Sequence, residues 1–119
     1  MAWKTFEEID AWKLARVLNQ RVWDLISEGA FGKDFALADQ MNRAAGSAMD
    51  NIAEGFDGGS NAEFARFLSY TQRSCSEVRS QLIRALDRNH IDSAAFEELV
   101  EMVSTIHRKT GGLIKRLKS

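Results

Sequence analysis

Apolar residues recur every three or four positions along four stretches of this chain, the spacing that places side chains on one face of an α-helix. The pattern predicts helices over about residues 6–28, 34–54, 60–89 and 93–117. No stretch shows the strict apolar and polar alternation of a half-buried β-strand. Four helices joined by short loops most simply form an up-down-up-down antiparallel four-helix bundle, so the predicted fold class is all-α.

Glycine and capping residues mark where these helices begin and end. The chain has no proline, and the glycine-containing segments 29–32 and 55–59 separate the first three predicted helices. Ser60 followed by Glu63 is the pattern of a capping box, in which each side chain bonds the backbone of the other residue. A length of 119 residues is that of one domain, 1–119. Candidates for capping the last helix are Asp92 and Ser93.

A polar seam is expected where the second and third predicted helices face each other. If the loop at 56–59 folds them into an antiparallel hairpin, residues whose numbers sum to roughly 120 lie opposite one another. Arg43 then faces Glu77, and Ser47 faces Ser74. We interpret the seam as structural, with a buried Arg43–Glu77 pair whose loss would cost ~3 kcal/mol or more; a ligand or catalytic site is the alternative. The polar seam consists of Arg43, Ser47, Asn51, Glu54, Ser74, Glu77 and Gln81.

The first predicted helix has apolar residues on two opposite faces, although a bundle helix needs only one apolar stripe. Aromatic residues are enriched at protein interfaces, so the second face predicts a contact between subunits. The alternative is that its tryptophans cover the loop 29–35. The candidate interface residues are Ile9, Trp12, Trp23 and Ile26.

One charge run is entirely basic and lies at the C-terminal end. Cations are stabilising near the negative, C-terminal end of a helix dipole, so this run fits an ordinary solvated helix terminus. A patch that contacts phosphates is the alternative, although no aromatic residues are interleaved for stacking on bases. The candidate nucleic-acid contacts are Arg108, Lys109, Lys115, Arg116 and Lys118.

Composition narrows the possible functions further. A formal net charge of −1 argues against binding nucleic acid or anionic membrane through overall charge. Binding of either would require a local basic patch. The single cysteine cannot form an internal disulfide, and the acidic segment 1–12 does not resemble a signal peptide, so we expect a cytoplasmic protein. No window approaches the ~18 consecutive apolar residues of a membrane-spanning helix.

No residue set for catalysis, metal binding or cofactor binding presents itself. His90 and His107 lack the spacing and companions of metal ligands. Cys75 falls on an apolar helix face, where a buried small hydrophobe is expected. The acidic residues Glu97, Glu98 and Glu101 are expected on a solvated helix face. We expect no cofactor, no small-molecule substrate and no enzymatic activity.

The runs QMNRAAGSAMDNIAEGF and SNAEFARFLSYTQRSCSEVRSQL, together with the opening FEEIDAWKLA, resemble the bacterial family of 23S rRNA intervening-sequence proteins, formerly labelled ribosomal proteins. Arg73 departs from the family pattern, which usually has glycine there, and is expected to alter packing beside Ser47. The matching residues are Gln40, Arg43, Ala44, Ser47, Asn51, Ile52, Ala53, Glu54, Gly55, Ser60, Glu63, Phe64, Phe67, Leu68, Ser74, Glu77, Gln81 and Leu82.

The resemblance implies a four-helix bundle that assembles into a ring-shaped homopentamer, and related bundles bind nucleic acid. From residues and resemblance together we expect a non-enzymatic oligomeric protein whose partners are further copies of itself and RNA or DNA. The alternative function is a protein-interaction scaffold that binds no nucleic acid.

Overall fold

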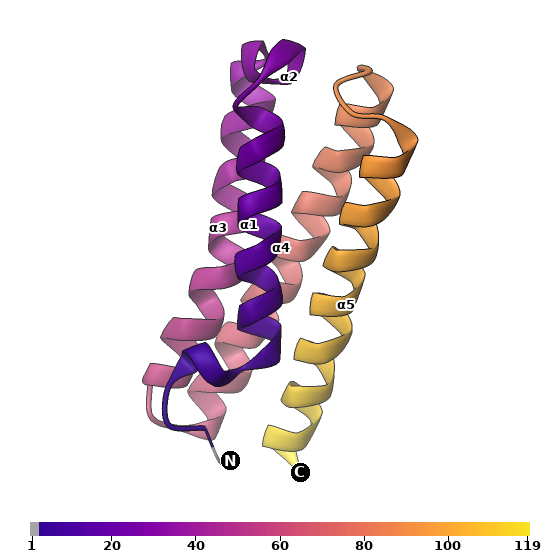
Figure 1. The fold of residues 1–119 in the computed structure, drawn as a ribbon. Helices are drawn as coiled ribbons and strands as arrows, with labels where there is room; N and C mark the ends of the chain where they lie inside the picture. Colours follow the sequence, from indigo (N-terminus) through magenta and orange to yellow (C-terminus); the bar gives the residue numbers. More distant parts are fainter. Residues whose placement is uncertain (1–2) are drawn as a thin grey trace.

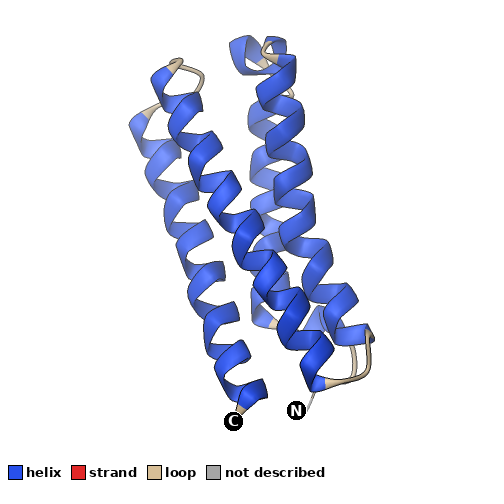
Figure 2. Ribbon diagram, turned by 180° about the vertical axis from the view of Figure 1, so that it is seen from behind, coloured by secondary structure: helices blue, strands red, loops and turns tan. Residues whose placement is uncertain are grey.

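The computed structural model describes residues 3–119 and contains four long antiparallel helices (Figure 1). Loops are confined to the two ends of the molecule, which measures 44 × 19 × 19 Å (Figure 2). No strand occurs among the described residues. The all-α four-helix bundle is therefore confirmed. Its elements are the 3₁₀-helix η1 (Phe6–Glu8) and the α-helices α1 (Asp10–Ile26), α2 (Gly29–Lys33), α3 (Phe35–Asp57), α4 (Asn61–Asp87) and α5 (Ser93–Lys118).

The first predicted helix is divided into two pieces, and a further short helix follows it. Ile9 has extended backbone angles (φ −77°, ψ 123°) and separates η1 from α1. Gly29 has a positive φ of 62°, which favours glycine, and the expected loop after it winds into α2. Phe31 of this short helix is buried and closes one end of the core.

The core is built from one apolar stripe of each long helix. Small side chains on α3, among them Ala44, Ala45 and Ala48, are buried and bring its backbone close to the neighbouring helices. The approach is tightest at Gly55, where an added Cβ would lie 2.6 Å from Cβ of Phe67 on α4. Glycine is required there because any larger residue would overlap α4.

Two predicted helix caps are observed, one of them only in part. Oδ1 of Asp92 accepts from the backbone N–H of Ala95 at 2.8 Å and caps α5. Oγ of Ser60 accepts from the backbone N–H of Glu63 at 3.1 Å. The carboxylate of Glu63 pairs instead with Arg66 at 2.6 Å, so the reciprocal half of the capping box is not formed.

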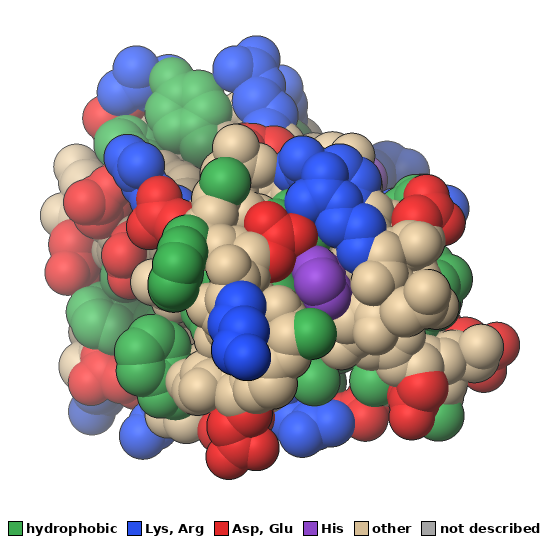
Figure 3. All heavy atoms as spheres, turned by 90° about the horizontal axis from the view of Figure 1, so that it is seen from above, with side chains coloured by type: hydrophobic (Ala, Val, Ile, Leu, Met, Phe, Trp, Pro, Cys, Tyr) green, Lys and Arg blue, Asp and Glu red, His purple; other side chains and the backbone are tan. Residues whose placement is uncertain are grey.

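A polar cluster ties together two loops at the end of the bundle where α2 lies. Oδ2 of Asp34, at the start of α3, lies 2.8 Å from Nη1 of Arg88 and 2.9 Å from Nε2 of His90. The ring of His90 also stacks on Phe31, with centroids 5.1 Å apart. Histidine, basic and acidic side chains meet in the middle of this end (Figure 3). The cluster joins the α2–α3 junction to the turn between α4 and α5.

This cluster predicts an acid-sensitive component of stability. Hydrogen bonds from His90 and then Arg88 hold the pKa of Asp34 below its ordinary value of 3.8. A carboxyl group whose pKa is lowered in the folded state stabilises the fold at pH values above its ordinary pKa. That stabilisation is lost as the pH falls through the lowered pKa of the folded state. Asp34→Asn should therefore lower the melting temperature at pH 6 and lessen its dependence on pH below about 4. Thermal unfolding followed by circular dichroism from pH 2 to pH 6 measures both effects. Asp57→Asn is the control, and equal pH profiles for the wild type and Asp34→Asn would contradict the role of the cluster.

Candidate functional site

The central part of the polar seam forms as predicted. Oγ of Ser74 donates to Oγ of Ser47 at 2.9 Å across α3 and α4. The amide of Asn51 donates to the backbone carbonyl and to Oγ of Ser47 at 2.8 and 2.9 Å. The buried hydroxyl of Thr71, which sequence reasoning missed because threonine also fits the apolar stripe, donates to the carbonyl of Ala48 at 2.9 Å. These bonds fix how the two helices are aligned.

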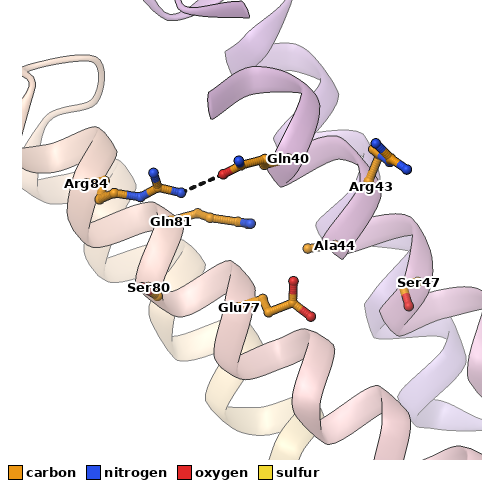
Figure 4. A pocket seen from close by; sticks show the side chains of 8 residues that line it. All are labelled: Gln40, Arg43, Ala44, Ser47, Glu77, Ser80, Gln81 and Arg84. Carbon is orange, nitrogen blue, oxygen red and sulfur yellow. Dashed lines mark hydrogen bonds between the residues drawn. The ribbon is translucent and has the colours of Figure 1, made fainter. Parts of the chain in front are cut away.

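The predicted Arg43–Glu77 pair is wrong. The side chain of Arg43 is 79% exposed and its nearest carboxylate is Asp39 of its own helix, at 3.6 Å. Glu77 is exposed, and within residues 3–119 it forms no ion pair. Glu54 is also exposed. Arg43 therefore lies at the outer edge of α3, as Figure 4 shows, and the seam contains no buried charge pair.

An open groove lies beside the seam, between α3 and α4. It has a volume of about 710 Å³. At one end, Nη2 of Arg84 donates to Oε1 of Gln40 at 2.7 Å, the dashed bond in Figure 4. The groove holds carboxylate, guanidinium, amide and hydroxyl groups, so it can bind a polar ligand. The α3–α4 groove is lined by Gln40, Arg43, Ala44, Ser47, Glu77, Ser80, Gln81 and Arg84.

Gln81 is the most unusual residue of this groove. It is only 6% exposed, and its buried Oε1 has no hydrogen-bond partner in the described part of the chain. An unsatisfied buried polar atom costs roughly 1–3 kcal/mol, so native structures rarely retain one without a reason. Figure 4 shows the side chain extending from α4 across the groove toward α3. The lining residues Ser80 and Arg84 were not predicted, although they continue the spacing of three and four that leads from Glu77.

Arg73 was expected to alter packing beside Ser47. The seam is nevertheless intact there, because the neighbouring Ser74 still donates a hydrogen bond to Ser47. Its guanidinium lies 5.8 Å from the ring centroid of Tyr70, and that of Arg66 lies 5.9 Å from the same ring. Tyr70 also packs edge-on against Phe67, with centroids 5.4 Å apart. The half-buried ring of Tyr70 on α4 is thus flanked by two guanidinium groups.

The interface predicted on helix one is partly wrong. Ile9 and Trp12 are 1% and 8% exposed and belong to the chain's own core. Because the extended backbone at Ile9 folds η1 back across α1, Phe6 packs against Trp12 with ring centroids 5.2 Å apart. Ile26 is half-buried, whereas Trp23 is 58% exposed. Phe35, which was not among the predicted interface residues, is 78% exposed at the start of α3.

The five predicted C-terminal cations are distributed over the last turns of α5. All of them are exposed, and none forms an ion pair with any residue between 3 and 119. Lys109 and Arg116 line a hollow beside Trp3 and the start of α1. Lys118 lines another hollow together with Arg66 of α4.

The remaining titratable residues that the structure describes include a buried thiol and an ion-paired carboxylate. Burial raises the pKa of Cys75 to about 12, so its thiol stays protonated at neutral pH. Across residues 3–119 no three His, Cys, Asp or Glu side chains gather closely enough to hold a metal ion. Glu98 is not simply solvated, because its carboxylate receives two bonds from Arg21 at 2.8 and 2.9 Å, and these lower its pKa. No helix in the described chain is long and apolar enough to span a membrane.

The fold and the groove define an antiparallel four-helix bundle protein with a polar seam between its second and third long helices. The family model of the 23S rRNA-intervening sequence proteins matches residues 7–112. The chain belongs to this family. A comparison with curated proteins gave no match. Many residues of the resembling motif line the α3–α4 groove, among them Gln40, Ala44 and Glu77.

The geometry of the seam predicts how two substitutions differ in their effect on stability. Arg43→Ala should change the free energy of unfolding by less than about 0.5 kcal/mol, because an exposed ion pair contributes little. Thr71→Val should lower it by about 1 kcal/mol, because it removes a buried hydrogen bond while keeping the shape of the side chain. Urea unfolding measures both values. A loss of ~3 kcal/mol for Arg43→Ala would instead restore the buried pair expected from the sequence.

Proposed function

We propose that this protein is a non-enzymatic, self-associating bundle that binds nucleic acid. The observation that carries the proposal is the group of five exposed cations on the last turns of α5, none of which has a carboxylate partner within the described residues. Free lysine and arginine side chains attract phosphates and release the counterions bound to them. A strand of RNA or DNA supplies such phosphates at regular intervals.

Charge is distributed unevenly along α5. Its first half carries Glu97, Glu98 and Glu101, and its last turns carry the five cations. A chain with a formal net charge of −1 therefore has a strongly basic end. The acidic half repels a polyanion while the basic end attracts it, so the charge pattern favours binding at one end of the bundle.

Self-association would place several basic ends on one assembly, and a cyclic assembly would multiply the attraction for a long ligand. Two large exposed aromatic side chains support self-association: Trp23 on α1 and Phe35 at the start of α3, which are 58% and 78% exposed. Large exposed aromatic side chains are enriched at interfaces between proteins. The homopentamer implied by the resemblance is the assembly that we propose.

The second candidate function is a protein-interaction scaffold that binds no nucleic acid. The same exposed Trp23 and Phe35 support it, because an aromatic surface contacts a different protein as readily as another copy of the chain. Only the basic end of α5 distinguishes the two functions, so the experiment must test that end.

Nucleic-acid binding predicts an affinity that falls steeply as salt concentration rises. The triple variant Lys115→Ala/Arg116→Ala/Lys118→Ala should bind a labelled RNA more weakly, and the slope of log K against log salt should fall by roughly 0.7–0.9 for each lost phosphate contact. Fluorescence anisotropy between 50 and 300 mM KCl measures both quantities. The control variant Lys13→Ala/Lys33→Ala/Arg79→Ala removes the same charge elsewhere and should keep more of the affinity. Absence of binding by the wild type would favour the scaffold.

A further inference from the structure

A stripe of polar and aromatic residues runs along α4 beside the α3–α4 groove. Its spacing of four, three, four, three and four residues places these side chains on one face of the helix. The stripe extends over about 27 Å, taking a rise of about 1.5 Å per residue. It begins next to the basic end of α5, because Arg66 and Lys118 line one hollow, and it ends at the groove. The α4 stripe consists of Arg66, Tyr70, Arg73, Glu77, Ser80 and Arg84.

We infer that the α4 stripe and the α3–α4 groove form the binding site for a single strand of nucleic acid, an inference that rests on the proposed function. The stripe supplies two kinds of contact that a single strand uses. The guanidinium of the exposed Arg73 and that of the half-buried Arg84, which is bonded to Gln40 at the end of the groove, supply positive charge for phosphates. Tyr70, held between Arg66 and Arg73 at 5.9 and 5.8 Å, offers a ring for stacking on an unpaired base.

The groove supplies the contact that reads a base edge. Gln81 lines the groove and its buried Oε1 has no partner within residues 3–119, so rotation of the amide toward the opening would let a ligand in the groove satisfy it. A glutamine amide combines a donor and an acceptor in one plane, which matches the edge of a nucleobase. Ser47 and Ser80 add hydroxyl groups, and the exposed carboxylate of Glu77 can accept from a base amine or a ribose hydroxyl. A volume of about 710 Å³ admits a nucleotide.

A paired duplex does not fit this arrangement. Its base edges are engaged with each other and its bases are stacked inside the helix, so neither Tyr70 nor Gln81 can reach them as proposed. The basic end of α5 attracts single and double strands alike, because it contacts phosphates alone. Selection of single strands is therefore the property that the groove adds.

The test compares three purified variants with the wild type, using a fluorescein-labelled twelve-nucleotide RNA and the corresponding RNA duplex as probes. Gln81→Leu should weaken binding of the single strand roughly fivefold or more. It should leave the melting temperature unchanged or raise it, because it removes an unsatisfied polar atom from the interior. A structural glutamine would show the opposite, a lower melting temperature with unchanged binding, and that result overturns the inference.

Arg73→Ala/Arg84→Ala tests the stripe independently of Gln81. This variant should weaken single-strand binding and lower the salt slope, whereas Arg79→Ala, an exposed arginine on the α5 side of the same helix, should not. Equal affinity of the wild type for the single strand and the duplex would overturn the inference.

The two proposals fail in different ways. If the groove variants bind like the wild type while the triple variant Lys115→Ala/Arg116→Ala/Lys118→Ala is impaired, the groove inference is wrong and the proposed function stands. If the wild type binds neither probe, both are wrong.

Discussion

The close approach of α3 to α4 is the constraint on which the rest of the structure depends. Gly55 leaves no room for a side chain against Phe67, and buried alanines along α3 keep the helix backbones near each other. At this distance the short side chains of Ser47 and Ser74 meet directly, and Thr71 reaches the carbonyl of Ala48. Larger residues at these positions would separate the helices and break the hydrogen bonds that align them.

The same constraint explains the groove. Where the helices are in contact, small polar groups satisfy one another, but the side chains just outside the contact are too long to fit between the helices. Arg43 and Glu77 consequently stay in solvent on either side of an opening instead of forming a buried pair. Gln81 lies in the floor of this opening with an unsatisfied oxygen. The site and the packing are thus two consequences of one helix pairing.

The helices, their antiparallel order and the position of the seam were predictable from the sequence. Apolar spacing and glycine segments determine them, and Ser47 opposite Ser74 follows from the hairpin register. The Arg43–Glu77 pair was not predictable in the same way, because a helical wheel gives the direction of a residue and not the direction of a long flexible side chain. The second apolar face of helix one was misread because the extended backbone at Ile9 ends the helical periodicity on which the wheel depends.

We propose that copies of this bundle assemble and carry nucleic acid. A native mass spectrum of the protein taken from lysate without nuclease treatment tests it most directly, because subunit number and retained oligonucleotide appear in one measurement. We expect a five-subunit mass with additional mass that ribonuclease or deoxyribonuclease removes. A bare monomer whose spectrum does not change after nuclease treatment would contradict it.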